Sequence, residues 1–334
     1  MKLKKFTSFI RGASPLQRFV LSIVLGALLL FISGRVDELR SYQGAQVAIF
    51  AIAISSIVLL TGFSGQISLG HGALMAVGGY SAVLIQAHLN IPYPFAFIVG
   101  AAVGGVAGFL LGIAAARLQG PYLAGTTLAL AVGLPSLANQ FHILGGEQGL
   151  TFDIGTAPSW IGKDFSQYRW FFWVSTFSAL AIFWLLRNLL STRYGRRWRA
   201  LRANSTAASL SGINVSRAKV LAFTLSSCVA GLAGSLYAML LGLVAPLAFT
   251  LTLSFTLITG AVLAGVSNLG GSIVGAVVLV AIPELSGSIT SHLGGSEKIT
   301  SNLPGVITSV LLIATVLLAP NGPHLPHGKK NRRQ

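Results

Sequence analysis

The polar side chains best able to bind a solute by hydrogen bonds lie in one short stretch between two apolar runs, from Gly62 to Gly72. Glycines and serines interrupt the pattern there and surround a glutamine and a histidine. Irregular backbone at membrane depth is tolerated only where it is buried in protein or lines a cavity, and broken segments often mark the substrate path of transporters. The candidate substrate-path residues are therefore Ser64, Gly65, Gln66, Ser68, Gly70 and His71. The alternative is a tight loop at the inner surface, with His71 as a packed, satisfied histidine.

The apolar runs themselves carry few groups that could do acid, base or nucleophilic chemistry. Glu284 follows Pro283 near the outer end of its run, where a structural role is favoured over one in transport. Ion-coupled carriers usually need intramembrane acids or histidines, and a hydrolase needs a nucleophile with a base and an orienting partner. The single cysteine, Cys228, excludes a disulfide framework. We predict no catalytic residue and no metal ligand.

Composition places the chain in a membrane. Of its 334 residues, 53% are hydrophobic and only 9% are charged, whereas soluble domains carry about 25% charge. The formal net charge is +16, but nucleic-acid binding needs a basic face on a folded surface. Here the charges form short clusters beside apolar runs, so no nucleic-acid partner is expected.

The elements that position the polar stretch are predicted to be membrane-spanning helices, each needing about 20 apolar residues. We predict an all-α polytopic membrane protein with about ten transmembrane helices. They are expected at 16–34, 43–61, 70–89, 95–117, 121–142, 170–190, 217–243, 249–266, 271–290 and 303–320. Residues 16–320 would form a single transmembrane domain, flanked by a basic cytoplasmic N-terminus at 1–15 and a basic cytoplasmic tail at 321–334.

Charge fixes the predicted orientation. With ten spans and both the N and C termini cytoplasmic, eighteen of the 23 Lys and Arg residues fall inside, and six of the seven acids fall outside. Lys and Arg gather in cytoplasmic loops. The longest inner loop is then 191–216, and the longest outer loop is 142–169.

Small residues recur every fourth position in two of the spans. One row is Gly100, Gly104, Gly108 and Gly112, and the other is Ala230, Gly234, Ala238 and Gly242. Small residues at this spacing let helix backbones approach closely. We interpret both rows as packing surfaces, with pore lining as the alternative.

The inner segment from Gly195 to Gly212 is predicted to form a short amphipathic helix. Trp198, Leu201 and Ala208 lie near one stripe at helical spacing. Gly212 is a predicted C-cap, and Ser216 is predicted to cap the next span. The helix either docks a soluble partner or lies on the membrane with its arginines on anionic lipid.

Several motifs resemble those of one transporter family. Residues 206–212 have the spacing of the E-A-A-x-x-x-G loop of bacterial ABC importer permeases. Residues 62–72 resemble the G-x-x-G-Q-x-S-L-G-H hallmark of the branched-chain amino acid permeases. Residues 144–150, 212–223 and 269–276 also resemble stretches of that family. The resemblance spans about 43–320 and favours the M-type subunit over its shorter H-type companion.

The resemblance implies that the inner segment is a coupling helix seated in a groove of an ATPase subunit. The residues it assigns to ATPase coupling are Arg199, Arg202, Thr206, Ala207, Ala208 and Gly212. The family's loop begins with an acidic residue where this chain has Thr206. We expect docking to be retained through shape and the neighbouring arginines.

The resemblance also implies partners. The chain has no G-x-x-x-x-G-K-[ST] phosphate loop, and its nearest candidate, at 162–164, lacks the first glycine and the hydroxyl. We therefore expect it to bind no cofactor and to be no enzyme, with ATP and Mg²⁺ held by two partner ABC ATPases. A second, H-type permease and an extracytoplasmic substrate-binding protein complete the implied assembly. In the outer loop, Glu147, Gln148 and Trp160 are candidates for docking that binding protein, unless the loop is a simple connector.

The implied function is one membrane subunit of an ATP-driven importer in the bacterial cytoplasmic (inner) membrane. Leucine, isoleucine and valine are the implied substrates. Urea or short amides, other amino acids and simple sugars remain alternatives, because related permeases handle each. A stand-alone channel or secondary carrier is less favoured, and a membrane enzyme is the weakest reading.

Overall fold

The computed structural model describes residues 34–89, 91–118, 120–151 and 165–293 without a break, together with isolated positions within 17–30, at 157 and within 303–317. The predicted terminal spans at 16–34 and 303–320 therefore lie largely outside the described residues, as do the two basic ends and Trp160.

The described chain is almost entirely helical. Its first long helix, α3, runs from Glu38 to Ile57 and continues as a π-helical turn, η1, from Val58 to Phe63. The helices that follow are α4 (His71–Leu89), α5 (Tyr93–Arg117), α6 (Pro121–Gln140), α7 (Gln167–Ser191), α8 (Arg193–Ala203), α9 (Ser205–Leu210), α10 (Val215–Leu241), α11 (Leu251–Leu263) and α12 (Gly271–Leu293). Short 3₁₀ turns are η2 (His142–Leu144), η3 (Gly146–Gln148) and η4 (Pro246–Phe249). Two short antiparallel strands, β1 (Leu150–Thr151) and β2 (Leu243–Val244), pair Leu150 with Val244.

Six described helical segments are long and apolar enough to cross a membrane. A seventh is added if α6 and the 3₁₀ turns after it, which meet at a bend of 102°, count as one span. The apolar part of α12, Gly271–Leu285, is shorter. The all-α polytopic class is thus confirmed, and the total of ten helices stays a prediction.

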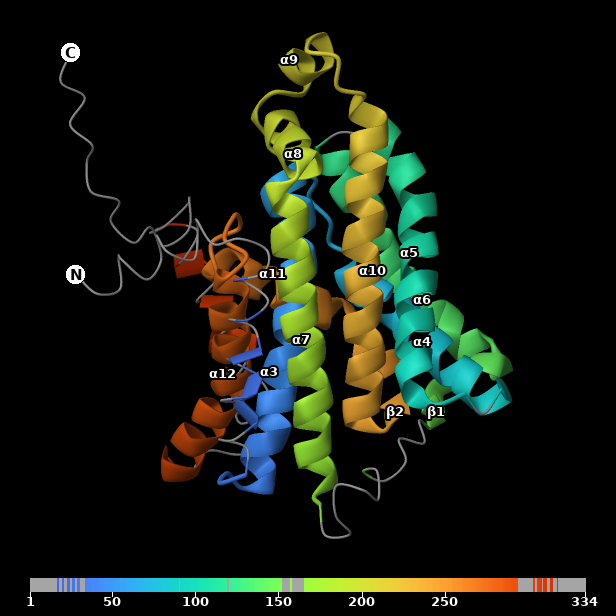
Figure 1. Cartoon of the computed structure of the whole chain (residues 1–334). Helices are drawn as coiled ribbons and strands as arrows, with labels where there is room; N and C mark the ends of the chain where they lie inside the picture. Colours follow the sequence, from blue (N-terminus) through green and yellow to red (C-terminus); the bar gives the residue numbers. More distant parts are fainter. Residues whose placement is uncertain are drawn as a thin grey trace, which may run out of the picture.

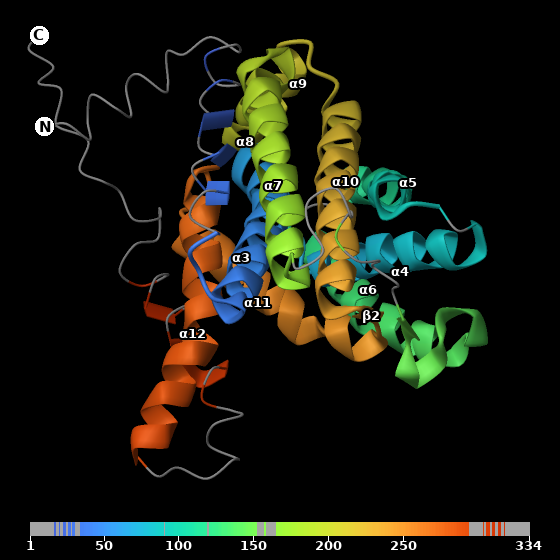
Figure 2. The same cartoon turned by 60° about the horizontal axis from the view of Figure 1, so that its bottom comes forward.

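The bundle is organised around α10. Helices α5 and α4 pack against it, while α3 lies between α7 and α12 (Figure 1). In the turned view, α7 and α10 again run side by side and α12 stays at the opposite edge from α5 (Figure 2). The buried core is built from α3, α4 and α10 and includes Ile49, Met75 and Leu236.

The close approach of α5 to α10 depends on the predicted glycine row. A Cβ added at Gly104 would lie 2.9 Å from the Ser227 carbonyl oxygen and 3.0 Å from the Gly231 Cα. The packing interpretation of the row from Gly100 to Gly112 is confirmed. The second row ends earlier than predicted, because Gly242 adopts a φ of +67° and terminates α10.

Charged side chains separate between the two ends of the bundle. At the end that carries α8 and α9, called here the basic end, the described charges are Arg117, Arg187, Arg193, Arg196, Arg197, Arg199, Arg202, Arg217 and Lys219. At the opposite end, called the acidic end, are all the described acids, Asp37, Glu38, Glu147 and Glu284, together with three arginines, Arg35, Arg40 and Arg169. Glu284 accepts a hydrogen bond of 3.0 Å from Gln43 Nε2 near the start of α3, which fits the structural role predicted for it.

Candidate functional site

The polar stretch begins where α3 loses its regular hydrogen bonding. The helix widens into η1, and π-helical turns often occur at functional sites. Beyond it, Gly65 has a φ of +77°, a conformation that favours glycine. The Gln66 amide then donates to the Leu60 carbonyl oxygen at 3.2 Å, which closes the end of the helix.

The stretch descends from the basic end into the middle of the bundle. Gln66 Nε2 donates to the Lys219 carbonyl oxygen at 3.2 Å, one turn into α10. His71 Nε2 lies 3.0 Å from Ser226 Oγ, and Ser226 lies roughly 16 Å along α10 from its first residue at 1.5 Å per residue. Helix α4 therefore starts at mid-bundle with a fully buried histidine.

Hydroxyl groups from two other helices replace backbone hydrogen bonds that the stretch lacks. Thr127 Oγ1 of α6 accepts from the Leu69 amide at 2.9 Å, and Ser254 Oγ of α11 accepts from the Gly72 amide at 3.0 Å. Buried backbone groups need such partners. Sequence reasoning missed these residues, although hydroxyls within apolar spans were a visible signal.

Ser226 holds His71 in one tautomer. Its hydroxyl donates to the Ser56 carbonyl oxygen at 2.7 Å. The same oxygen must therefore accept from His71, which places the imidazole proton on Nε2. The histidine links α3, α4 and α10 as a packed, hydrogen-bonded group, and a role for it in the substrate path stays a prediction.

The inner segment is two helices, not the single one predicted. Asn204 separates α8 from α9 with φ −162° and ψ 111°, and its Oδ1 accepts from the Thr206 and Ala207 amides at 3.0 Å each. A short asparagine side chain competes with the backbone and favours such a cap. The predicted cap at Ser216 is also wrong, because Asn214 Oδ1 accepts from the Arg217 amide at 2.9 Å.

The apolar stripe of this segment faces the bundle. Trp198 and Leu201 of α8 are buried, and Trp198 Nε1 donates to the Ala218 carbonyl oxygen of α10 at 2.9 Å. On α9 Ala208 is buried, and Gly212 follows the helix with a φ of +80°, as predicted. The remaining coupling candidates, Arg199, Arg202, Thr206 and Ala207, are exposed.

The two predicted sites meet at one place. Arg202 Nη1 donates to the Gly62 carbonyl oxygen, and a Cβ at Gly65 would lie 3.2 Å from Arg202 Cγ. A cavity of about 220 Å³ opens beside this contact, and it is lined by Ser64, Gly65, Gln66, Ile67, Leu118, Gly120, Leu123, Leu201, Arg202, Ser205 and Lys219. Ser68, Gly70 and His71 lie deeper and are buried among the helices. The predicted substrate-path residues thus divide into a group at the cavity and a packed group.

The outer candidates lie at the acidic end. Glu147 and Gln148 are exposed on η3. Gly145 and Gly149 flank this turn with φ of +79° and +74°, and β1 and β2 pair directly beyond it. Docking of a binding protein there stays a prediction.

Comparison with known proteins bears on these sites. The family described as "Branched-chain amino acid transport system / permease component" matches residues 42–319, a range that includes both the polar stretch and the α8–α9 segment. The chain belongs to this family. The resemblance to branched-chain amino acid permeases predicted from the motifs is therefore confirmed.

This permease-family chain is similar to the high-affinity branched-chain amino acid transport system permease protein LivM of Salmonella typhimurium, with 29% identity over 71% of the chain and 61% of LivM. It thus spans about three fifths of that relative's length. It is 25% identical to LivH of the same organism, over 84% of the chain and 91% of LivH. The autoinducer 2 import system permease protein LsrC of Escherichia coli is 30% identical over 71% of the chain and 66% of LsrC. No solved structure matches the permease.

Proposed function

We propose that this chain is one membrane subunit of an ATP-driven importer that moves branched-chain amino acids across the bacterial cytoplasmic membrane. A second, H-type permease pairs with it, and two partner ATPases bind ATP and Mg²⁺ at the basic end. An extracytoplasmic binding protein delivers the solute at the acidic end, where Glu147 and Gln148 are exposed.

The observation that carries the proposal is the contact between Arg202 and Gly62. It joins the α8–α9 segment to the interrupted span, so a displacement of one moves the other. An ATPase that binds one orientation of α8 and α9 more tightly than the other would thereby shift the bundle between two states. No residue of this chain has to touch ATP.

The exposed face of the α8–α9 segment suits a protein partner better than lipid. A helix lying on a membrane buries its apolar face among the lipids, but here Trp198, Leu201 and Ala208 are buried within the permease itself. What remains exposed is mostly polar or basic, including Arg199 and Thr206, together with one large apolar side chain, Leu210, at the end of α9. We therefore assign this face to the groove of an ATPase.

The solute is proposed to be neutral overall. The described spans carry hydroxyl, amide and backbone groups at mid-bundle and place their acids at one end. Leucine, isoleucine and valine are the first candidates because the LivM relatives carry that activity in their names. Autoinducer 2 is a second candidate, since LsrC is 30% identical. Urea or short amides, other amino acids and simple sugars follow.

The test is uptake of radiolabelled leucine into proteoliposomes. The vesicles hold this chain, its partner permease and both ATPases, with the binding protein outside and ATP inside or omitted. Uptake that requires both ATP and the binding protein supports the proposal. Uptake without ATP points to a channel or secondary carrier and overturns it. ATP hydrolysis without leucine uptake keeps the importer and redirects the search to autoinducer 2, amides or sugars.

A further inference from the structure

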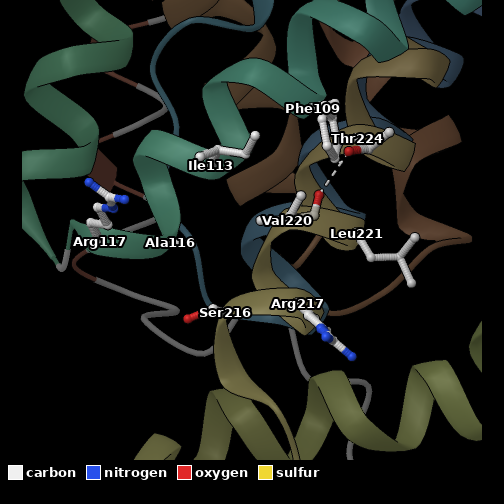
Figure 3. Close-up of a pocket in the computed structure, with 9 residues that line it drawn as sticks. All are labelled: Phe109, Ile113, Ala116, Arg117, Ser216, Arg217, Val220, Leu221 and Thr224. Carbon is white, nitrogen blue, oxygen red and sulfur yellow. Dashed lines mark hydrogen bonds between the residues drawn. The ribbon is translucent and has the colours of Figure 1, made fainter.

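A groove of about 540 Å³ runs between α5 and α10 and opens on the outside of the bundle near the basic end (Figure 3). Its lining residues are Phe109, Ile113, Ala116, Arg117, Ser216, Arg217, Val220, Leu221 and Thr224. We propose that it binds one anionic phospholipid of the cytoplasmic leaflet. The proposal rests on the orientation proposed above, with the basic end facing the cytoplasm, and not on the identity of the solute.

The inner part of the groove fits an acyl chain. Phe109 and Ile113 on α5 and Val220 and Leu221 on α10 offer apolar walls. The one polar side chain among them, Thr224, donates its hydroxyl hydrogen to the Val220 carbonyl oxygen at 2.9 Å, so no polar group there is left without a partner (Figure 3).

The groove also joins the apolar outer face of α5. Phe109 and Ile113 are 48% and 44% exposed, and they continue a row that includes Ile98 and Val106. The two backbones stay close because a Cβ at Gly112 would already lie 3.2 Å from the Val220 Cα. Side chains on either side of that contact form the groove walls, and an acyl chain would cover them.

The mouth of the groove carries positive charge. Arg117 in the last turn of α5 and Arg217 in the first turn of α10 lie on its two sides with Ser216 between them, and their guanidinium groups point away from one another (Figure 3). Neither guanidinium has a hydrogen bond or ion pair with any residue that the structure describes, and the described acids lie at the other end of the bundle. The positive N-terminal end of α10 adds to this field.

An apolar groove with two unneutralised cations at its mouth is complementary to an amphiphile with an anionic head. Basic pockets between helices on the cytoplasmic side of a membrane bind anionic head groups, because the cytoplasmic leaflet is rich in them. A soluble anion would use the arginines and leave the apolar walls bare. The arginines lie at the last turn of α5 and the first turn of α10, at the ends of two candidate membrane spans, where a lipid head group would be expected.

The experiment is native mass spectrometry of the purified full-length chain in detergent, with equal amounts of phosphatidylglycerol and phosphatidylethanolamine added. The expected result is preferential retention of one phosphatidylglycerol. Changing both arginines, Arg117→Gln with Arg217→Gln, should weaken its binding roughly tenfold to thirtyfold, since each basic residue near the surface contributes about a fivefold attraction. Arg197→Gln, which removes a charge from α8 outside the groove, should leave binding unchanged.

Two further variants test the apolar walls of the groove without changing its charge. Ile113→Trp should fill the groove and lower phosphatidylglycerol retention, whereas Ile98→Trp on the outer part of α5 should not. Equal retention of the two lipids by the unmodified chain would overturn the proposal. So would displacement of phosphatidylglycerol by millimolar inorganic phosphate, which would assign the arginines to a free anion, or retained selectivity in the double-arginine variant.

Discussion

At the scale of single residues, the unusual feature is that a side chain of the inner segment bonds to the backbone of an interrupted span. Arg202 donates to Gly62, and Gly65 packs against the same arginine. The carbonyl oxygen of Gly62 lies near the end of the π-helical turn, where the Gln66 amide donates to Leu60 instead, so an external donor stabilises it. Arg202 thus serves the fold of the polar stretch as well as the proposed coupling.

Replacing this donor should loosen the polar stretch. Hydrogen bonds from charged donors contribute about 1.5–3 kcal/mol, and exposure of Arg202 reduces this to about 1 kcal/mol. We expect Arg202→Ala to raise the hydrogen-exchange rate of the amides in 64–70 about fivefold, measured by mass spectrometry on the purified chain. Arg197→Ala on the same helix is the control, and an equal increase in that variant would contradict the assignment.

The cap at Asn204 makes a separate prediction. Asn204→Ala removes the acceptor for the Thr206 and Ala207 amides, at a cost of about 1 kcal/mol. Exchange of the amides in 205–211 should become about fivefold faster. Asn204→Asp keeps an acceptor oxygen and should exchange like the unmodified chain; fast exchange in that variant as well would mean that α9 does not depend on the cap.

At the scale of elements, glycine decides how closely α4, α5 and α10 pack. A Cβ at Gly231 would lie 2.5 Å from the Gly100 carbonyl oxygen and 3.1 Å from the Gly104 Cα. Backbone atoms cannot move aside as a flexible side chain can. The three helices therefore form one rigid unit, against which the interrupted span and α8 are placed.

A matched pair of glycines tests this packing. Gly231→Ala should lower the unfolding midpoint in detergent by several degrees, because overpacking costs about 1–3 kcal/mol. Gly133→Ala in α6, where a Cβ would meet nothing within 4 Å, should leave the midpoint unchanged or raise it, since alanine favours a helix by about 0.5–1 kcal/mol. Equal midpoints for the two variants would show that the crossing tolerates a methyl group.

At the scale of the whole molecule, the separation of charge sets the orientation. Nine of the twelve described Lys and Arg residues lie at the basic end, and all the described acids lie at the other (Figure 1). Moving basic loops across a membrane is unfavourable. The end that carries α8 and α9 is thus expected to face the cytoplasm.

Cysteine labelling tests this orientation. In a Cys228→Ala background, Glu147→Cys should react with a membrane-impermeant maleimide in intact spheroplasts, whereas Ser209→Cys should react only after the membrane is opened. Both native side chains are exposed. The chain is expressed without its partners, so that no ATPase shields α9. Labelling in the opposite order would reverse the topology and remove the basis for placing ATPases at this end.

The sequence predicted the positions of the helices well and the contacts between them poorly. Apolar runs located α3 to α7 and α10 within a few residues, because hydrophobic length is a local property of the chain. The motif at 62–72 and the segment at 195–212 were found as separate signals. Their junction at Arg202, the break at Asn204 and the supporting hydroxyls of Thr127 and Ser254 were not.

The sequence by itself determined the membrane class, the charge asymmetry and the family, since these depend on composition and on residues close together in the chain. Only the tertiary structure decided what the polar stretch bonds to. Arg202 lies 140 positions from Gly62, and Ser254 lies 182 positions from Gly72. Such pairs form when helices pack, and packing depends on where small residues let backbones approach, which no local pattern specifies.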